Sequence, residues 1–365
     1  RPGMSLLDCF QITRLVGEGN FGTVYEARDL RDQELRGDAG ERRCALKILH
    51  RKKYRAEGMM ARARHERQVL KAARHPFIIR LLCALRTPAR ELALVMEYCP
   101  NGDLNELVVR RGRPGLEEGL ARRLLAEVLL ALQYLHEELD VIFRDLKPEN
   151  VVLDAAMHAK LTDFGLVKVN ATAEEAAHSF VGSTFYVAPE VSAYGCEPYG
   201  NAVDLYALGL VSWVCLTGGV RVVVGPEENI ASEASRPLER AEPPPTHEAL
   251  QEWLRAAQVV AGVGTPASAS QGSQPAQAFA CSLPPVTGLS VPALSWVETL
   301  TAREPAARGT AGSLRSHPFF ARSGLHPPLA CGDEWAALLP LVSEPATPTS
   351  TGSTDSWAWD PSWRA

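Results

Sequence analysis

An octapeptide and the tripeptide that follows it constrain this 365-residue chain more than any other feature. The octapeptide, Phe143–Asn150 (FRDLKPEN), sets a carboxylate, a lysine and an asparagine on one short loop. The tripeptide, Asp163–Gly165 (DFG), adds a second carboxylate after a span that can hold a two-stranded hairpin. A loop without a chemical role would rarely contain both, so we interpret them as parts of one reactive site.

These side chains are the groups that phosphoryl transfer from ATP requires. The reaction needs a carboxylate that orients and deprotonates a hydroxyl group, and a cation near the migrating phosphoryl group. It also needs two oxygen ligands for Mg²⁺. The pattern therefore predicts phosphoryl transfer, and the upstream sequence supplies the phosphate-binding segments that such a reaction uses.

A glycine-rich segment lies near the start of the chain. Residues 17–24 (GEGNFGTV) follow the pattern G-x-G-x-x-G-x-V, between strand-like segments at Ile12–Val16 and Val24–Ala27. Alone the pattern is weak, because a Rossmann turn also contains it. A Rossmann glycine turn opens a helix, however, whereas a second strand-like segment follows here. We therefore predict a hairpin whose glycines let backbone amides approach phosphate oxygens.

An apolar strand with one inward lysine is predicted at Cys44–Leu49 (CALKIL). The polar segment Asp29–Arg43 before it is interpreted as a long solvated connection between strands. Lys47 is either a residue that keeps an edge strand soluble or a ligand for phosphate. The glycine-rich segment upstream favours phosphate binding.

Helical composition follows at His50–Leu70, where Glu66 lies among basic neighbours. Its carboxylate can pair with Lys47 and hold the ammonium toward the α- and β-phosphates of a nucleotide. Alternatively, Glu66 is a surface residue in an ordinary i,i+4 ion pair. The segment alone does not decide between the two, and the ordered motifs around it favour the pair with Lys47.

With these motifs in this order, the chain resembles a eukaryotic protein kinase catalytic domain. It resembles in particular the AGC group of serine/threonine kinases, the relatives of cAMP-dependent kinase, Akt and the S6 kinases. An aromatic residue, Phe143, replaces the usual histidine before Arg144, as AGC kinases commonly show. Four segments carry the resemblance to this group: HERQVL (65–70), HPFI (75–78), LTDFG (161–165) and HPFF (317–320).

The resemblance covers about residues 8–322 and implies an α+β, bilobal kinase fold. The N-lobe, residues 8–97, would be a small antiparallel sheet with one main helix. The C-lobe, residues 98–322, would be larger and mostly helical, with ATP in the cleft between the lobes. Residues 323–365 would be an AGC-like tail, partly disordered, whose tryptophans either pack on the small lobe or form a mobile end.

The resemblance also implies catalytic roles for residues that match the family's motifs. Asp145 would be the base that accepts the proton of the substrate hydroxyl. Lys147 would neutralise the γ-phosphoryl group in the transition state, and Lys47 with Glu66 would position the phosphates. Mg²⁺ would bind to Asn150 and Asp163.

Further positions would bind the nucleotide. Met96 matches the gatekeeper, the backbone of Glu97 and Cys99 would recognise adenine, and Asp103 matches the acid that binds ribose. The complete predicted set for ATP is Gly17, Glu18, Gly19, Asn20, Phe21, Gly22, Val24, Ala45, Lys47, Met96, Glu97, Cys99, Asp103, Glu149, Asn150 and Asp163.

Two helices are predicted in the larger lobe. Leucine and valine recur with helical spacing between Leu120 and Leu135, which indicates a long amphipathic helix. The apolar stretch Leu205–Val224 approaches the length of a membrane span. Two glycines and Arg221 interrupt it, and DLYALG (204–209) matches a kinase helix motif, so we expect a buried helix and no transmembrane segment.

The chain departs from the family between about residues 220 and 290. The Pro-Pro-Phe turn that usually follows the apolar helix is absent, and residues 264–285 are rich in Ala, Ser, Gln and Pro, which indicates a disordered insertion. The pattern recovers at Trp296–Arg308, where Arg308 is predicted to pair with Glu190.

Substrate choice is predicted from two acids. Asp103 and Glu149 match AGC residues that meet substrate arginines, so protein substrates are expected to be basic before the acceptor Ser or Thr. Alternatively, Asp103 serves only ribose and Glu149 only the structure of its loop.

Regulation is predicted at Ser179. The segment His178–Ser183 resembles an AGC activation loop, in which an upstream kinase would phosphorylate Ser179. An otherwise unpaired Arg144, together with Lys168, is the expected partner of that phosphate. Alternatively, Ser179 is one of many solvated loop serines, and Glu174-Glu175 already supply the negative charge.

Composition excludes some other classes. A formal net charge of −5 argues against a general nucleic-acid binder. Eight cysteines without CxxC spacing suit a reducing compartment, so a cytoplasmic location is expected, with the nucleus as an alternative. No signal peptide is visible, and the opening Arg1-Pro2-Gly3 suits an excised domain whose true N-terminus is missing.

The opposed hypothesis is a pseudokinase scaffold, which binds partners through an intact fold without turnover. Retention of Lys47, Glu66, Asp145, Asn150 and Asp163 argues against it, because a scaffold has no chemical need for all five. The divergent region after residue 220 is its only support.

Overall fold

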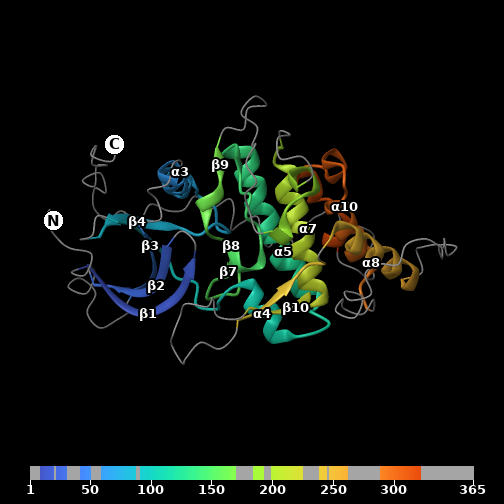
Figure 1. Ribbon diagram of the computed structural model, residues 1–365, viewed down its shortest axis with the longest axis horizontal. Helices are drawn as coiled ribbons and strands as arrows, with labels where there is room; N and C mark the ends of the chain where they lie inside the picture. Colours follow the sequence, from blue (N-terminus) through green and yellow to red (C-terminus); the bar gives the residue numbers. More distant parts are fainter. Residues whose placement is uncertain are drawn as a thin grey trace.

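A sheet-based small lobe and a larger helical lobe make up the structure, a computed structural model (Figure 1). This arrangement confirms the predicted α+β bilobal fold. The structure describes residues 9–19, 22–30, 42–50, 59–87, 91–169, 184–192, 199–224, 238–244, 246–261 and 288–321.

The small lobe is built on a five-stranded antiparallel sheet in the order β1-β2-β3-β5-β4. One face of the sheet buries a small apolar cluster that includes Phe10, Leu46 and Val95, as the alternation of strand residues requires. Helix α3 covers the other side, with Glu66 and Leu70 on its buried face. The elements are β1 (Phe10–Gly19), β2 (Gly22–Asp29), β3 (Arg42–Leu49), α3 (Met59–Ala72), β4 (Leu81–Arg86) and β5 (Leu92–Glu97).

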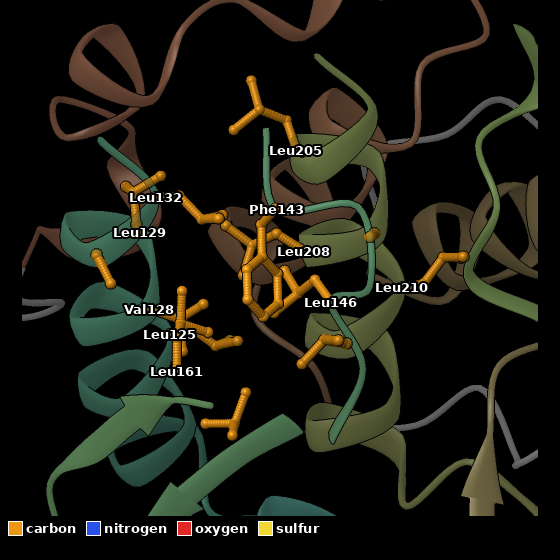
Figure 2. Packing of buried hydrophobic residues seen from close by; sticks show 14 of the residues in the cluster. Leu125, Val128, Leu129, Leu132, Phe143, Leu146, Leu161, Leu205, Leu208 and Leu210 are labelled. Atoms are coloured by element: carbon orange, nitrogen blue, oxygen red, sulfur yellow. The ribbon is translucent and has the colours of Figure 1, made fainter. Parts of the chain in front are cut away.

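Two apolar helices form the centre of the large lobe. Leucines of α5 and α7 face each other, and Phe143 and Leu146 of the intervening loop fill the space between them (Figure 2). Nearly every residue of α7 is buried, and a side chain on Gly209 would collide with Leu300 of α10. The helices are α4 (Leu104–Arg111), α5 (Glu118–Gln133), α6 (Pro189–Ser192), α7 (Ala202–Thr217), α8 (His247–Val260), α10 (Val291–Leu300) and α11 (Ala311–Leu314).

Helix α7 therefore confirms the prediction of a buried helix. Among the described residues, no helix combines the length and the apolar character that crossing a membrane demands.

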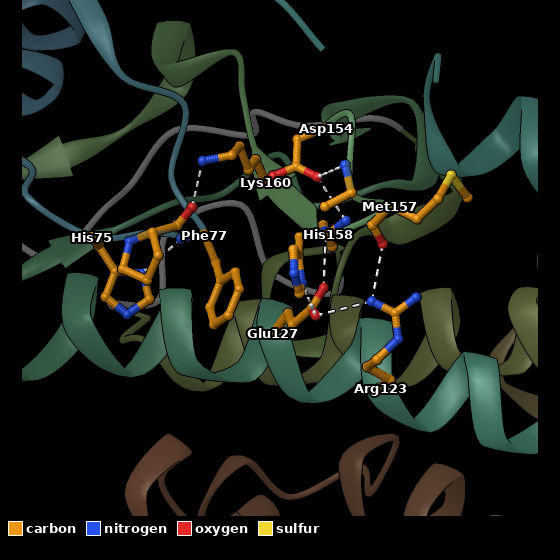
Figure 3. A network of polar contacts seen from close by, with 11 residues as sticks. His75, Phe77, Arg123, Glu127, Asp154, Met157, His158 and Lys160 are labelled. Carbon is orange, nitrogen blue, oxygen red and sulfur yellow. Dashed lines mark hydrogen bonds and ion pairs between the residues drawn. The ribbon is translucent and has the colours of Figure 1, made fainter. Parts of the chain in front are cut away.

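A buried carboxylate anchors the short hairpin β7 (Val151–Leu153) and β8 (Ala159–Leu161) to α5 (Figure 3). Glu127 accepts the backbone N–H of Ala159 at 2.6 Å and contacts His158 Nδ1 at 2.7 Å. Arg123, one turn earlier, donates to Glu127 and to the carbonyl of Met157. Because this hairpin leads directly into Asp163, the network fixes where that carboxylate lies.

The same hairpin connects the large lobe to the segment before β4 (Figure 3). Lys160 donates from Nζ to the carbonyl of Pro76 at 2.6 Å and pairs with Glu97 at 3.2 Å. Burial and the charge of Lys160 lower the pKa of His75 to about 4. The neutral ring can therefore accept the N–H of Phe77 at Nδ1, at 3.3 Å.

Ordered elements also occur in the region that the sequence showed only as divergent. Strands β10 (Val220–Val224) and β11 (Leu238–Glu242) form an antiparallel hairpin, and α8 follows. The predicted insertion at residues 264–285 and the predicted tail at 323–365 lie outside the described residues. The predicted limits of the lobes stay a prediction.

Candidate active site

The loop that carries Asp145 is held by its backbone. Asp204, at the start of α7 and 1% exposed, accepts the N–H groups of Phe143 at 2.8 Å and Arg144 at 2.7 Å. His136 Nε2 also lies 2.8 Å from the same carboxylate. These contacts hold Arg144 in a left-handed conformation, with a φ of 69°. A carboxylate in the core thus positions the loop.

Asp145 is oriented by two neighbours on its own loop. Asn150 donates from Nδ2 to the carbonyl oxygen of Asp145 at 2.7 Å and to its Oδ2 at 2.8 Å. The ammonium of Lys147 lies 3.1 Å from the same Oδ2. Asp145 is buried, whereas Lys147 remains partly accessible, so the cation can reach a group that approaches from solvent.

Lys47 lies between two carboxylates. Its Nζ is 2.6 Å from Glu66 Oε1 and 2.8 Å from Asp163 Oδ1. The structure therefore brings Lys47 and Glu66 together, as the sequence analysis predicted. Asp163 itself adopts a left-handed conformation (φ 60°), which turns its side chain back toward the N–H of Gly165.

The pKa values of this cluster follow from burial and from opposite charge. Burial lowers the pKa of the Lys47 ammonium, but Asp163 and Glu66 outweigh it and raise that pKa above the ordinary value. Burial raises the pKa of Asp163, and the charge of Lys47 more than offsets this, so the carboxyl stays ionised. Burial raises the pKa of Glu66 against the opposing effect of Lys47.

Asn150 and Asp163 suit a hard cation. Both offer oxygen, and Asn150 uses its amide nitrogen toward Asp145, which turns its oxygen into the atom available to a metal. The described residues contain no cluster of three or more His, Cys, Asp or Glu side chains that could enclose an ion. Mg²⁺ fits such a partial site, because it usually takes one or two protein ligands together with phosphate oxygens.

Strand pairing gathers the predicted nucleotide residues of the small lobe. Gly17 lies opposite Val24 and Gly19 opposite Gly22, so the glycine-rich segment is a hairpin, as predicted. A side chain on Gly22 would collide with the carbonyl of Ile48, and this position therefore requires glycine. Asn20 and Phe21 lie outside the described residues, and Glu18 pairs in register with Thr23.

Ala45 and Met96 face each other across β3 and β5, and Met96 is buried. The side chain of Glu97 is already engaged, because it accepts the N–H of Arg80 at 2.8 Å and pairs with Lys160. The backbone N–H of Glu97 donates to the carbonyl of Arg80 at 3.0 Å, and the recognition of adenine by the backbone of Glu97 stays a prediction. Cys99 is half-buried just beyond β5, and burial raises the pKa of its thiol to about 12, which favours the protonated form.

Asp103 has a structural role besides its predicted one. Its side chain accepts the N–H of Glu106 at 2.8 Å and so caps the N-terminus of α4. Burial raises the pKa of its carboxyl to about 7. Glu149, the second acid predicted to meet substrate arginines, pairs with Arg240 of β11 at 3.4 Å, which the sequence analysis did not predict.

One sequence argument was wrong. Arg144 was expected to lack a partner until a phosphate arrived, but its guanidinium donates to the carbonyls of Leu166 and Val167 and to the hydroxyl of Tyr199. A basic side chain next to a sharply turned backbone finds carbonyl acceptors within reach. Ser179, its predicted partner, lies outside the described residues.

The predicted pair of Arg308 and Glu190 is confirmed. Two parallel bonds of 2.6 and 2.8 Å join them, and Arg308 is fully buried. The role of Asp204 in holding the catalytic loop was missed. The sequence did contain an indication of this role, because Asp204 is an acidic residue at the start of an otherwise apolar helix. A carboxylate in a buried helix is stable only when it has hydrogen-bond partners.

Comparison with known proteins agrees with this geometry. Residues 10–320 match the protein kinase domain family. The chain belongs to this family. Ribosomal protein S6 kinase beta of Caenorhabditis elegans is 36% identical to this kinase domain over 211 residues, which are 58% of the chain. The aligned part is 36% of that relative, so the match covers about a third of its length. Members of the family use ATP and Mg²⁺, which the oxygen ligands and the Lys47 cluster suit.

Proposed function

We propose that this kinase domain transfers the γ-phosphoryl group of ATP to serine and threonine hydroxyls of proteins. The observation that carries the proposal is the constellation around Asp145, with Asn150 and Lys147 on its carboxylate, in a protein whose Lys47 bridges Glu66 and Asp163. A scaffold without turnover would not need these contacts to persist together.

The residues divide the reaction between them. Asp145 accepts the proton of the substrate hydroxyl as its oxygen attacks phosphorus, and Lys147 lies close enough to offset charge on the transferred group. Lys47 holds the α- and β-phosphates, and Glu66 fixes its ammonium. Asn150 and Asp163 would hold Mg²⁺, which supplies positive charge to the phosphates when it is bound.

Radiolabelled ATP with generic basic peptides tests the activity. Label is expected on serine or threonine after acid hydrolysis of the product. Nucleotide binding without any transfer would favour the pseudokinase alternative.

Substrates are proposed to be basic on the N-terminal side of the acceptor. Glu149 and Asp103 support this, because both are acids beside the catalytic loop and a guanidinium pairs well with a carboxylate. A positional peptide library should show enrichment of arginine before the acceptor. A flat profile would contradict the preference.

Activation is proposed to follow phosphorylation of Ser179 by an upstream kinase. Support comes from the position of Ser179 between Asp163 and Glu190 and from the resemblance of its segment to AGC activation loops. The contacts of Arg144 remove the argument that this arginine awaits a phosphate. The test compares Ser179→Ala with wild type after treatment with an activating kinase, and equal activity of the two would exclude the switch.

A cytoplasmic location, with the nucleus as the alternative, is also proposed. The five cysteines in the described part of the chain form no disulfides, which suits a reducing compartment. Cell fractionation of the tagged protein tests this location, and recovery in a secretory fraction would contradict it.

A further inference from the structure

The hairpin β10–β11 is fastened to the large lobe through Ala241. The N–H of Ala241 donates to Oδ1 of Asn105, a buried residue of α4, at 2.9 Å. Its carbonyl accepts the hydroxyl of Tyr186 at 3.5 Å. Strand β11 therefore lies between α4 and the end of the segment that leads into α6, which is the neighbourhood of the catalytic loop.

Residues on either side of Ala241 share the other face of the strand, because successive strand residues alternate. Arg240 extends from this face to Glu149, with 3.4 Å between Nε and Oε1. Glu242 is 8% exposed, and its Oε2 has no hydrogen-bond partner among the described residues. Burial and the charge of Glu149 raise the pKa of the Glu242 carboxyl, while Arg240 and Lys147 lower it.

The Arg240–Glu149 pair thus lies on the same face of β11 as the buried carboxyl of Glu242. We propose that Arg240 is a specificity-determining residue, which competes with a basic substrate residue for the carboxylate of Glu149. The inference rests on the proposed function, since it assigns to Glu149 the substrate arginine expected there. It adds that Arg240 of the same chain already pairs with Glu149.

The exposure of the two side chains indicates that a substrate arginine can displace Arg240 from Glu149. The Arg240 side chain is 43% exposed, whereas that of Glu149 is 21% exposed, so the acid is the fixed partner and the arginine can swing into solvent. An exposed ion pair contributes little free energy, and its removal should change substrate affinity by only about twofold to fivefold. The buried Oε2 of Glu242, which has no hydrogen-bond partner within the described residues, would accept a hydrogen bond from a second substrate guanidinium.

The experiment uses two peptides that differ only in having arginine or alanine before the acceptor serine. For Arg240→Met, which keeps the apolar stem, KM for the arginine peptide should fall by about twofold to fivefold relative to wild type. KM for the alanine peptide should stay within error, and kcat should change less than KM. Arg255→Met is the matched control, because Arg255 lies on α8 and, within the described part of the chain, donates only to the carbonyl of Gln251 on the same helix.

Two further variants keep the test decisive. Glu149→Gln should abolish the difference between the peptides in both the wild-type and the Arg240→Met backgrounds. If Arg240→Met lowers the melting temperature strongly, Arg240→Lys, which retains the charge but not the fork of donors, should give a smaller shift in the same direction.

Peptide affinity measured by fluorescence anisotropy separates this inference from the proposed function, because it requires no turnover. Tighter binding of the arginine peptide by Arg240→Met would support the competition even if transfer failed. Equal arginine selectivity in wild type and Arg240→Met, by KM and by affinity, would overturn it. Absence of arginine selectivity in both proteins would overturn it together with the role of Glu149.

Discussion

Lys47 of β3 and Glu66 of α3 form a buried ion pair, with 2.6 Å between Nζ and Oε1. The pair joins the sheet of the small lobe to its main helix, and Asp163 extends it into the large lobe. The arrangement aligns the cation that we propose to bind the phosphates with the proposed Mg²⁺ ligand Asp163. Replacement of each residue of the site should therefore have a different effect on nucleotide binding or turnover.

Lys47→Met should lower kcat/KM by about 100-fold, because the phosphates lose the cation that positions them. Steady-state kinetics over a range of ATP concentrations measures the effect. Lys71→Met, on an exposed position of α3, is the control and should behave as wild type. Full activity of Lys47→Met would show that the cluster does not hold the nucleotide.

Asp145→Asn should reduce kcat by about 10²–10⁴-fold while nucleotide affinity stays nearly constant, since only the proton acceptor is lost. Single-turnover assays and nucleotide titration measure the two quantities separately. Asp140→Asn is a suitable control, because Asp140 is exposed and has a φ of 51° that asparagine also tolerates. Transfer at the wild-type rate by Asp145→Asn would remove this residue from the mechanism.

Asp163→Ala should abolish the dependence of ATP binding on Mg²⁺, because one of two oxygen ligands disappears. Calorimetric titration of ATP with and without Mg²⁺ tests this. Lys47 retains Glu66 in the variant, so metal-independent affinity should fall less than the affinity measured with the metal. An unchanged effect of Mg²⁺ would rule out Asp163 as its ligand.

Asp103→Asn should stabilise the protein at alkaline pH but not at acid pH. The pKa of Asp103 rises from an ordinary 3.8 to about 7 in the folded state, so folding favours the protonated form. That contribution is complete below about pH 4 and is lost as pH rises through 7. Asparagine keeps the helix cap without the charge, and at pH 8 the free energy of unfolding should increase by about 1–3 kcal/mol. Urea unfolding at pH 4 and pH 8 measures it, and a difference independent of pH would contradict the assignment.

Arg308→Met should lower the free energy of unfolding by about 3–5 kcal/mol, because it leaves Glu190 without its partner in a largely buried site. Scanning calorimetry records the loss as a lower melting temperature. The neighbouring Arg303, 69% exposed and 3.9 Å from Glu248, provides the control, and Arg303→Met should change stability little. Similar losses for both variants would mean that burial does not govern the pair.

Local pattern predicted the features that depend on spacing or on a motif. The helical recurrence of leucine located α5, and the order of the motifs favoured the Lys47–Glu66 pair. The resemblance to protein kinases implied the Arg308–Glu190 pair. The hairpin β10–β11 was not predicted, because the connection between its strands, residues 225–237, is much longer than a two-residue hairpin turn. Asn105, which binds the N–H of Ala241 on β11, also lies far away in sequence. Contacts of this kind depend on tertiary packing, which no window of sequence contains.

The partners of Arg144 were missed for a related reason. Two of its acceptors are the backbone carbonyls of Leu166 and Val167. Every residue has a carbonyl, so composition carries no signal for such a contact.

Helix α7 holds the backbone of the catalytic loop through Asp204 at its first turn and packs its leucines against Phe143 and Leu146. The hairpin β10–β11 begins after the last turn of α7, beyond Gly218. The hydrogen bonds to the catalytic loop and the hairpin that we propose to influence substrate choice therefore lie at opposite ends of one buried helix. On that proposal, changes of sequence after Gly218 would alter substrate choice without moving the reacting groups. Replacement of β10–β11 by a different hairpin should accordingly alter substrate specificity and leave the residues of phosphoryl transfer in place.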